Sequence, residues 1–249
     1  MSALRTMLFL SALAGLAAGV AMTLLQFFAT VPLILEAERY ETTAPLEAAG
    51  PDHAHPAGPA GEAPAAHDHG GAEEWEPADG FQRMSLTAIA NLATAVGFGL
   101  LLVAASECVG GIQGWRQGML WGLAGFAAFT LAPGLGLPPE LPAMPAADLA
   151  LRQAWWIGCV AATAAGLALI AWGGGPALGF LGAALLVAPH LIGAPQPASH
   201  ESPIPADLHH RFVVAVTVTN LIFWILLGYA VALLRPRFAA ELEPRALAA

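Results

Sequence analysis

The chain of 249 residues contains no lysine, and all nine of its strongly basic residues are arginines. A P-loop needs the lysine of GxxxxGK[ST] to hold nucleotide phosphates, so this chain by itself is no conventional ATPase. Charged residues are also scarce, at 11% of the chain, against about a quarter in soluble domains. Hydrophobic residues make up 57% of the chain, and the mean hydropathy is +0.64. These values exclude an ordinary water-soluble domain.

The chain has only two cysteines, Cys108 and Cys159, and neither stands in a CxxC pair. This spacing excludes a structural zinc site and a thioredoxin-like motif. A basic patch of the kind that binds nucleic acid is also missing. Charge is instead concentrated in one acidic segment: eleven of the eighteen acids lie between Glu36 and Asp79, where Arg39 is the only base. Such a segment raises the local concentration of cations.

Long hydrophobic runs are the main feature that the chain does have. Six of them approach the ~20 residues that a helix needs to cross ~30 Å of hydrocarbon. They cover roughly residues 7–33, 86–106, 116–135, 154–172, 176–192 and 212–234. The first run continues to Leu35, beyond the apolar core of a signal peptide, so we expect it to be retained. We therefore predict an all-α integral membrane protein, with one membrane domain over residues 1–249 built as a bundle of about six transmembrane helices.

The arginines decide between six spans and five, because cytoplasmic loops carry the excess of basic residues. With six spans and an internal N-terminus, five arginines lie inside and four lie outside. The internal ones are Arg5, Arg116, Arg235, Arg237 and Arg245. Without the run 176–192, only three arginines would lie inside. We therefore predict six spans, both termini in the cytoplasm, and external segments at 36–85, 136–153 and 193–211.

Residues 44–80 form one long external segment that is rich in Pro, Ala, Gly, acids and His. With hardly any large apolar side chain, the segment cannot bury enough surface to offset its ordering entropy, so we expect disorder. Its histidines stand beside aspartates in two short tracts, and they are His53, His55, His67 and His69. Imidazole and carboxylate together suit divalent cobalt, nickel and zinc. We predict unselective metal capture by this loop; the alternative is a solvated loop with incidental histidines.

The six-span threading places all the other histidines on the same external face. They are His190, His200, His209 and His210. Two carboxylates that follow the first run, Glu36 and Glu38, are candidate ligands at this face. We predict a rim site formed by His190, Glu36 and one of His209 or His210, because two adjacent helix residues cannot both point into one site. Interfacial histidines and carboxylate anchors are the alternative interpretation.

Four strings of the sequence carry a resemblance to a known family. They are VPLILEAERYE (31–41), GLAGFAAFTLAPGLGLPPELP (122–142), RQAWWIGCVAATAAGLALIAW (152–172) and PHLIGAP (189–195). They resemble the family of probable cobalt transporter subunits, CbtA, over nearly all of the chain outside 44–80. The resemblance implies a bacterial inner-membrane protein that takes up cobalt for cobalamin synthesis beside CbtB, a small single-span subunit that bears histidine. The family is often drawn with five spans.

The resemblance also implies functional positions, and these are Glu36, Glu38, Glu140, Arg152 and His190. Together with the residue chemistry it leads to a membrane subunit that passes divalent cobalt, or nickel or zinc, into the cell. A non-conducting metal-binding scaffold is the second hypothesis. A haem-binding redox enzyme comes last, because haem needs axial histidines on facing helices and the histidines here lie outside the spans. We therefore predict no enzyme and no permanently bound cofactor.

Overall fold

A computed structural model describes residues 3–43 and 80–238, and within these ranges the chain is helical and contains no strand. Five helical stretches are long and apolar enough to cross a membrane, which confirms the predicted all-α membrane fold. They are Leu4–Ala29, Phe81–Glu107, Trp115–Gly136, Leu149–Trp172 and Ala206–Arg237. The predicted run 176–192 forms a sixth apolar helix, which at 17 residues is shorter than these five.

The first apolar run forms two helices rather than one: α1 (Ala3–Ala29) and α2 (Val31–Thr43). The break is at Thr30, whose hydroxyl donates to the Gln26 carbonyl at 3.1 Å. Pro32 follows in the first turn of α2, where its missing N–H costs no helical hydrogen bond. The acidic residues after the break therefore lie on a separate short helix.

The span from Trp115 to Gly136 contains a π-helical turn. In this turn the backbone N–H of Ala132 donates a hydrogen bond to the carbonyl of Ala127, five residues back. Pro133 follows directly, and its ring would clash with the carbonyl four residues earlier in a regular α-helix. The wider π turn accommodates this proline. The segments of the span are α4 (Trp115–Phe126), η1 (Ala127–Leu131) and α5 (Ala132–Gly136).

The main apolar core lies among α1, α3 (Phe81–Glu107), α4 and α8 (Ala206–Leu234). Trp224 of α8 is almost completely buried there. The helices α4 and α8 approach each other most closely at Gly118 and Gly228, because a Cβ atom on either would collide with the backbone of the other. Small residues permit this close packing where lipid surrounds the helices.

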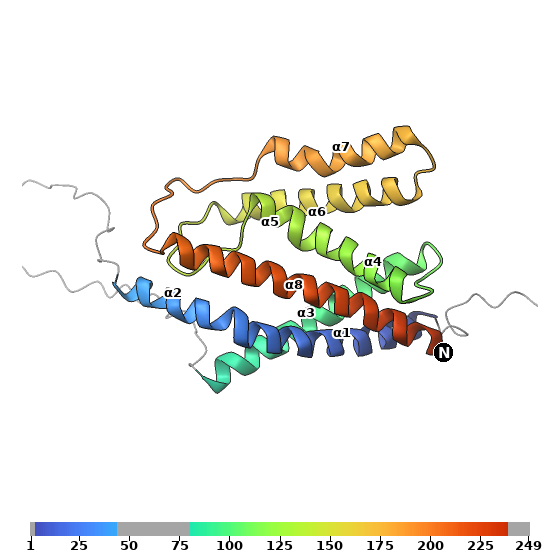
Figure 1. Ribbon diagram of the computed structural model, residues 1–249, viewed down its shortest axis with the longest axis horizontal. Coiled ribbons are helices and arrows are strands. Elements are labelled where there is room, and N and C mark those ends of the chain that lie inside the picture. Colours follow the sequence, from blue (N-terminus) through green and yellow to red (C-terminus); the bar gives the residue numbers. More distant parts are fainter. Residues whose placement is uncertain (1–2, 44–79, 239–249) are drawn as a thin grey trace, which may run out of the picture.

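The helices α6 (Leu149–Trp172) and α7 (Pro176–Ile192) form an antiparallel hairpin. They meet at Gly166 and Gly182, where a Cβ atom on Gly166 would lie 2.7 Å from the Gly182 carbonyl oxygen. Figure 1 shows that the hairpin lies beside α4 and α5, on the side of the bundle away from α1. Residues near the start of α6 therefore share one end of the bundle with residues near the end of α7.

The bundle has two ends with different connections (Figure 1). We call one the His190 end, because His190 lies near the end of α7 there. It is formed by α2 and by the connections 137–148 and 193–205. We call the other the Arg235 end. It is formed by the start of α1, the connections 108–114 and 173–175, and η2 (Arg235–Arg237).

Candidate metal site

Charged residues and histidines are divided unequally between the two ends. Among the described residues, the His190 end holds seven carboxylates, four arginines and four histidines. Its carboxylates are Glu36, Glu38, Glu41, Glu140, Asp148, Glu201 and Asp207. The described part of the Arg235 end holds one carboxylate, Glu107, and four arginines: Arg5, Arg116, Arg235 and Arg237. Carboxylate and imidazole ligands are therefore concentrated at the His190 end.

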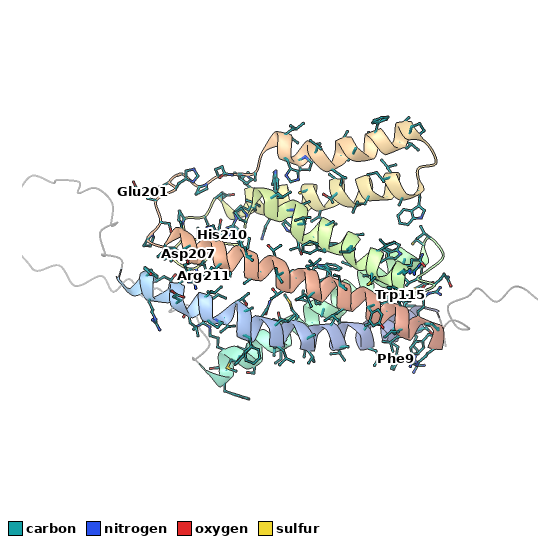
Figure 2. All side chains as sticks on the ribbon, in the orientation of Figure 1. Phe9, Trp115, Glu201, Asp207, His210 and Arg211 are labelled. Atoms are coloured by element: carbon teal, nitrogen blue, oxygen red, sulfur yellow. The ribbon has the colours of Figure 1, made fainter. Side chains whose placement is uncertain are left out.

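Glu36 is placed against the start of α8. Its Oε2 lies 3.5 Å from Nη2 of Arg211, and Nε of Arg211 lies 3.2 Å from Oδ2 of Asp207. Figure 2 shows Asp207, His210 and Arg211 together at the start of α8. The neighbouring Ala37 is fully buried in a small apolar cluster that joins α2 to α8. This packing fixes the position of Glu36 at the His190 end.

Glu38 points to a different helix. Both of its carboxylate oxygens accept hydrogen bonds from Arg83 of α3, and the Nη1–Oε2 distance is 3.2 Å. The two carboxylates of α2 therefore diverge, with Glu36 directed to α8 and Glu38 directed to α3. One ion cannot bind both without a rearrangement of these ion pairs.

The start of α6 holds Arg152 and contacts two further positions of the predicted site, Glu140 and His190. Arg152 forms an ion pair with Glu140, with 2.9 Å between Nη2 and Oε2. One turn later, Trp155 Nε1 donates to the Pro189 carbonyl at 3.3 Å. The ring of Trp155 also meets His190 edge to face, with 6.2 Å between centroids. His190 is thus held by the hairpin, beside an aromatic ring.

The adjacent histidines of α8 have different surroundings. Nε2 of His209 lies 3.1 Å from the carbonyl oxygen of Pro139, in the connection after α5. His210 is exposed and lies next to Arg211. The first therefore contributes to the packing between α8 and the 137–148 connection, whereas the second faces outward.

Two cavities in the described part of the chain differ in their lining residues. The larger, of about 420 Å³, has no titratable lining residue and does not suit an ion; its lining is Val109, Ala165, Ala168, Leu169, Trp172 and Gly173. The smaller, of about 150 Å³, lies at the His190 end. Glu140, His200 and His209 line it, together with several prolines. Of these two cavities, only the smaller one offers metal ligands.

Residues 4–235 match the family described as "Probable cobalt transporter subunit (CbtA)". The chain belongs to the CbtA family. This confirms the resemblance found in the sequence, and it supports a membrane subunit of cobalt transport that works with other subunits. No curated protein and no solved structure matches the chain.

The predicted ligands of this CbtA chain are not gathered into one group of three. Within residues 3–43 and 80–238, no three His, Cys, Asp or Glu side chains lie close enough together to hold one metal ion directly. The structure brings Glu36 to the helix that carries His209 and His210, whereas His190 lies on the hairpin. The loop histidines lie outside the described residues; they are His53, His55, His67 and His69. A metal site built from these residues stays a prediction.

The sequence did not predict that Glu140 and His200 share a cavity with His209. His209 contacts Pro139, which is 70 positions away in the chain, and no periodic pattern reports such a contact. The signal that was present is compositional. Two proline-rich strings, PGLGLPPELP before α6 and GAPQP after α7, supply the walls that meet at this cavity.

Proposed function

We propose that this chain is the membrane subunit through which cobalt, or a similar divalent ion, passes from the external face into the cell. Family membership supports cobalt transport. The observation that supports the direction is the concentration of ligands at one end: four histidines and seven carboxylates lie at the His190 end, against one described carboxylate at the Arg235 end. Carboxylate and imidazole suit borderline divalent ions, and an acidic surface raises the cation concentration near it.

In this proposal the His190 end faces outward and the Arg235 end faces the cytoplasm of a bacterium. Four described arginines belong to the Arg235 end, and Arg245 follows them in the sequence. Cytoplasmic segments carry the excess of basic residues, and five against four favours this orientation. Both termini then lie in the cytoplasm.

The ion pairs of the His190 end are suited to exchange with an arriving ion. The acidic segment 44–80 would collect hydrated ions through its histidines. Glu36, Glu38 and His190, with one of His209 or His210, would then select among them at the rim. The carboxylates are already paired with arginines, so an arriving divalent cation competes with a single positive charge for each of them. The onward path follows helix interfaces of this chain and of a small single-span partner resembling CbtB.

A second candidate function is a metal-binding scaffold that conducts nothing by itself. The middle turns of the described spans contain no Asp, Glu or His. The amide of Asn91 on α3 is already bonded to Gln26 of α1, with 2.7 Å between Nδ2 and Oε1. This contact joins two helices. An ion would therefore find few side-chain ligands inside this chain, which favours a path shared with a partner.

Uptake of radioactive cobalt by cells that express this chain, with and without the small partner, tests the proposal. We expect the double variant Glu36→Ala/His190→Ala to lower uptake by about tenfold or more, as loss of metal-site groups typically does. Glu201→Ala is the control, because Glu201 is an exposed carboxylate at the same end and on a different segment from Glu36 and His190. Equal uptake by wild type and double variant would contradict the rim site. Absence of uptake in every correctly inserted form would favour the scaffold.

A further inference from the structure

The cavity of about 150 Å³ at the His190 end collects ligand groups from three parts of the chain. Glu140 comes from the connection after α5, His200 from the connection before α8, and His209 from the first turns of α8. We propose that a hydrated divalent cation is received in this cavity before it moves into the bundle. The proposal rests on the transport function proposed above, and it names the place where that function begins.

His209 has the hydrogen bond that metal-binding histidines commonly use to fix their ring. Its Nε2 lies 3.1 Å from the Pro139 carbonyl oxygen. A carbonyl oxygen only accepts hydrogen bonds, so Nε2 carries the hydrogen and donates it. In the neutral ring, Nδ1 then keeps its lone pair. A histidine ligand typically donates its second N–H to a carbonyl or carboxylate in this way, which sets both tautomer and orientation.

The cavity wall favours a cation over an anion. Four of its lining residues are prolines, which have a backbone carbonyl but no N–H group. They are Pro138, Pro145, Pro195 and Pro197. Their fixed φ angles also keep the wall rigid. Because no arginine lines the cavity, the nearest formal charge in its wall is the carboxylate of Glu140.

Glu140 is held by an ion pair that a divalent ion can weaken. Nη2 of Arg152 lies 2.9 Å from Oε2 of Glu140, and the two side chains are 28% and 25% exposed. Water screens a pair of this exposure, so the pair contributes little to stability. A divalent cation carries twice the charge of the guanidinium, so it competes with Arg152 for the carboxylate even with its water ligands in place. Ion binding therefore weakens the pair between Arg152 and Glu140.

The ion is received with most of its water. The described residues contain no group of three ligands close enough to bind it directly. Each water molecule needs roughly 30 Å³ of liquid volume, so a cavity of about 150 Å³ holds a small hydration cluster. Glu140 and His200 act on this water, and Nδ1 of His209 is the first side-chain atom to replace a water ligand.

Equilibrium dialysis of radioactive Co²⁺ against the purified full chain in detergent tests the cavity. The four histidines of the 44–80 segment are changed to alanine in every sample, so that they add no binding. His209→Gln is the main variant, because a glutamine amide can still donate to the Pro139 carbonyl while the imidazole is lost. Glu201→Gln is the matched control for Glu140→Gln, since Glu201 is an exposed carboxylate at the same end that does not line the cavity.

We expect His209→Gln and Glu140→Gln each to weaken Co²⁺ binding by about tenfold or more, while Glu201→Gln stays within about twofold of wild type. Equal loss in the Glu201 control, or no loss in any variant, would overturn the cavity site. Binding that is lost in His209→Gln, in a protein that transports no cobalt in cells, would sustain the site and remove the transport function. Cobalt uptake that survives His209→Gln unchanged would sustain transport and overturn the cavity as its starting point.

Discussion

The two ends of the bundle hold their ion pairs in opposite ways. At the Arg235 end, Nε and Nη2 of Arg235 donate to the two oxygens of Glu107 at 2.6 and 3.0 Å. These side chains are only 7% and 12% exposed. At the His190 end, the paired carboxylates of Glu36, Glu38 and Glu140 are 43%, 28% and 25% exposed. The ion pair at the Arg235 end is almost completely buried, whereas the ion pairs at the His190 end remain in contact with water.

This difference separates a structural contact from exchangeable ones. Removal of one partner from a buried pair leaves an uncompensated charge and costs about 3–5 kcal/mol. A water-exposed pair is worth about 0–1 kcal/mol, because solvent already screens both charges. The pair at the Arg235 end therefore fixes the end of α8 to the end of α3, whereas the carboxylates of the His190 end can change partners at little cost.

The largest effect is expected for Glu107→Ala. It leaves the guanidinium of Arg235, which is 6% exposed as a residue, without its carboxylate, and the expected loss of stability is about 3–5 kcal/mol. The measurement is thermal unfolding of the purified protein in detergent, with Tm as the readout. The double variant Glu107→Ala/Arg235→Ala should recover part of the loss, because no buried charge remains. A single variant with an unchanged Tm would contradict the structural role of this pair.

A smaller loss is expected for Gly111→Ala at the same end. Gly111 has a φ of +73°, and a Cβ atom there would overlap the guanidinium of Arg235. The left-handed backbone alone costs a residue with a side chain about 1–2 kcal/mol, and the displaced arginine adds to this. Gly114→Ala is the control, because its backbone is extended and no atom lies within 4 Å of the added Cβ. The same unfolding assay should show a lower Tm for Gly111→Ala only.

The smallest effect on stability is expected for Glu38→Gln at the His190 end. Its pair with Arg83 is 28% and 38% exposed, so the loss should remain below about 1 kcal/mol. Unfolding at low and high salt checks this, since screening should reduce the difference between Glu38→Gln and wild type further. A loss as large as that of Glu107→Ala would remove the distinction between the two ends.

The fold class could be predicted because apolar runs report membrane helices directly. The sequence predicts a span over residues 116–135, and the structure has helical segments from Trp115 to Gly136. The break at Thr30 could not be predicted in the same way, because a single threonine does not end the apolar run, which continues to Leu35. The π turn before Pro133 was likewise absent from the hydrophobic pattern, which reports where a span lies and not how its turns are wound.

The candidate site was less predictable, because its contacts join distant parts of the chain. Sequence chemistry placed His190, His209 and Glu36 at the same end, and the structure has all three there. Their individual partners depend on packing: His209 meets the Pro139 carbonyl and His190 meets Trp155. No spacing rule relates residues whose separation is set by how the helices pack.

The most direct test of the proposed uptake is to measure the orientation of the chain in the membrane. Its own cysteines provide the probe. Cys108 is exposed at the Arg235 end, and Cys159 is buried. We expect a membrane-impermeant maleimide to leave Cys108 unlabelled in intact spheroplasts and to label it after permeabilisation. A Glu201→Cys variant in a Cys108→Ala background should be labelled in intact spheroplasts, because Glu201 lies at the His190 end (Figure 2). The reverse labelling would place the histidines in the cytoplasm and contradict capture of the ion from outside.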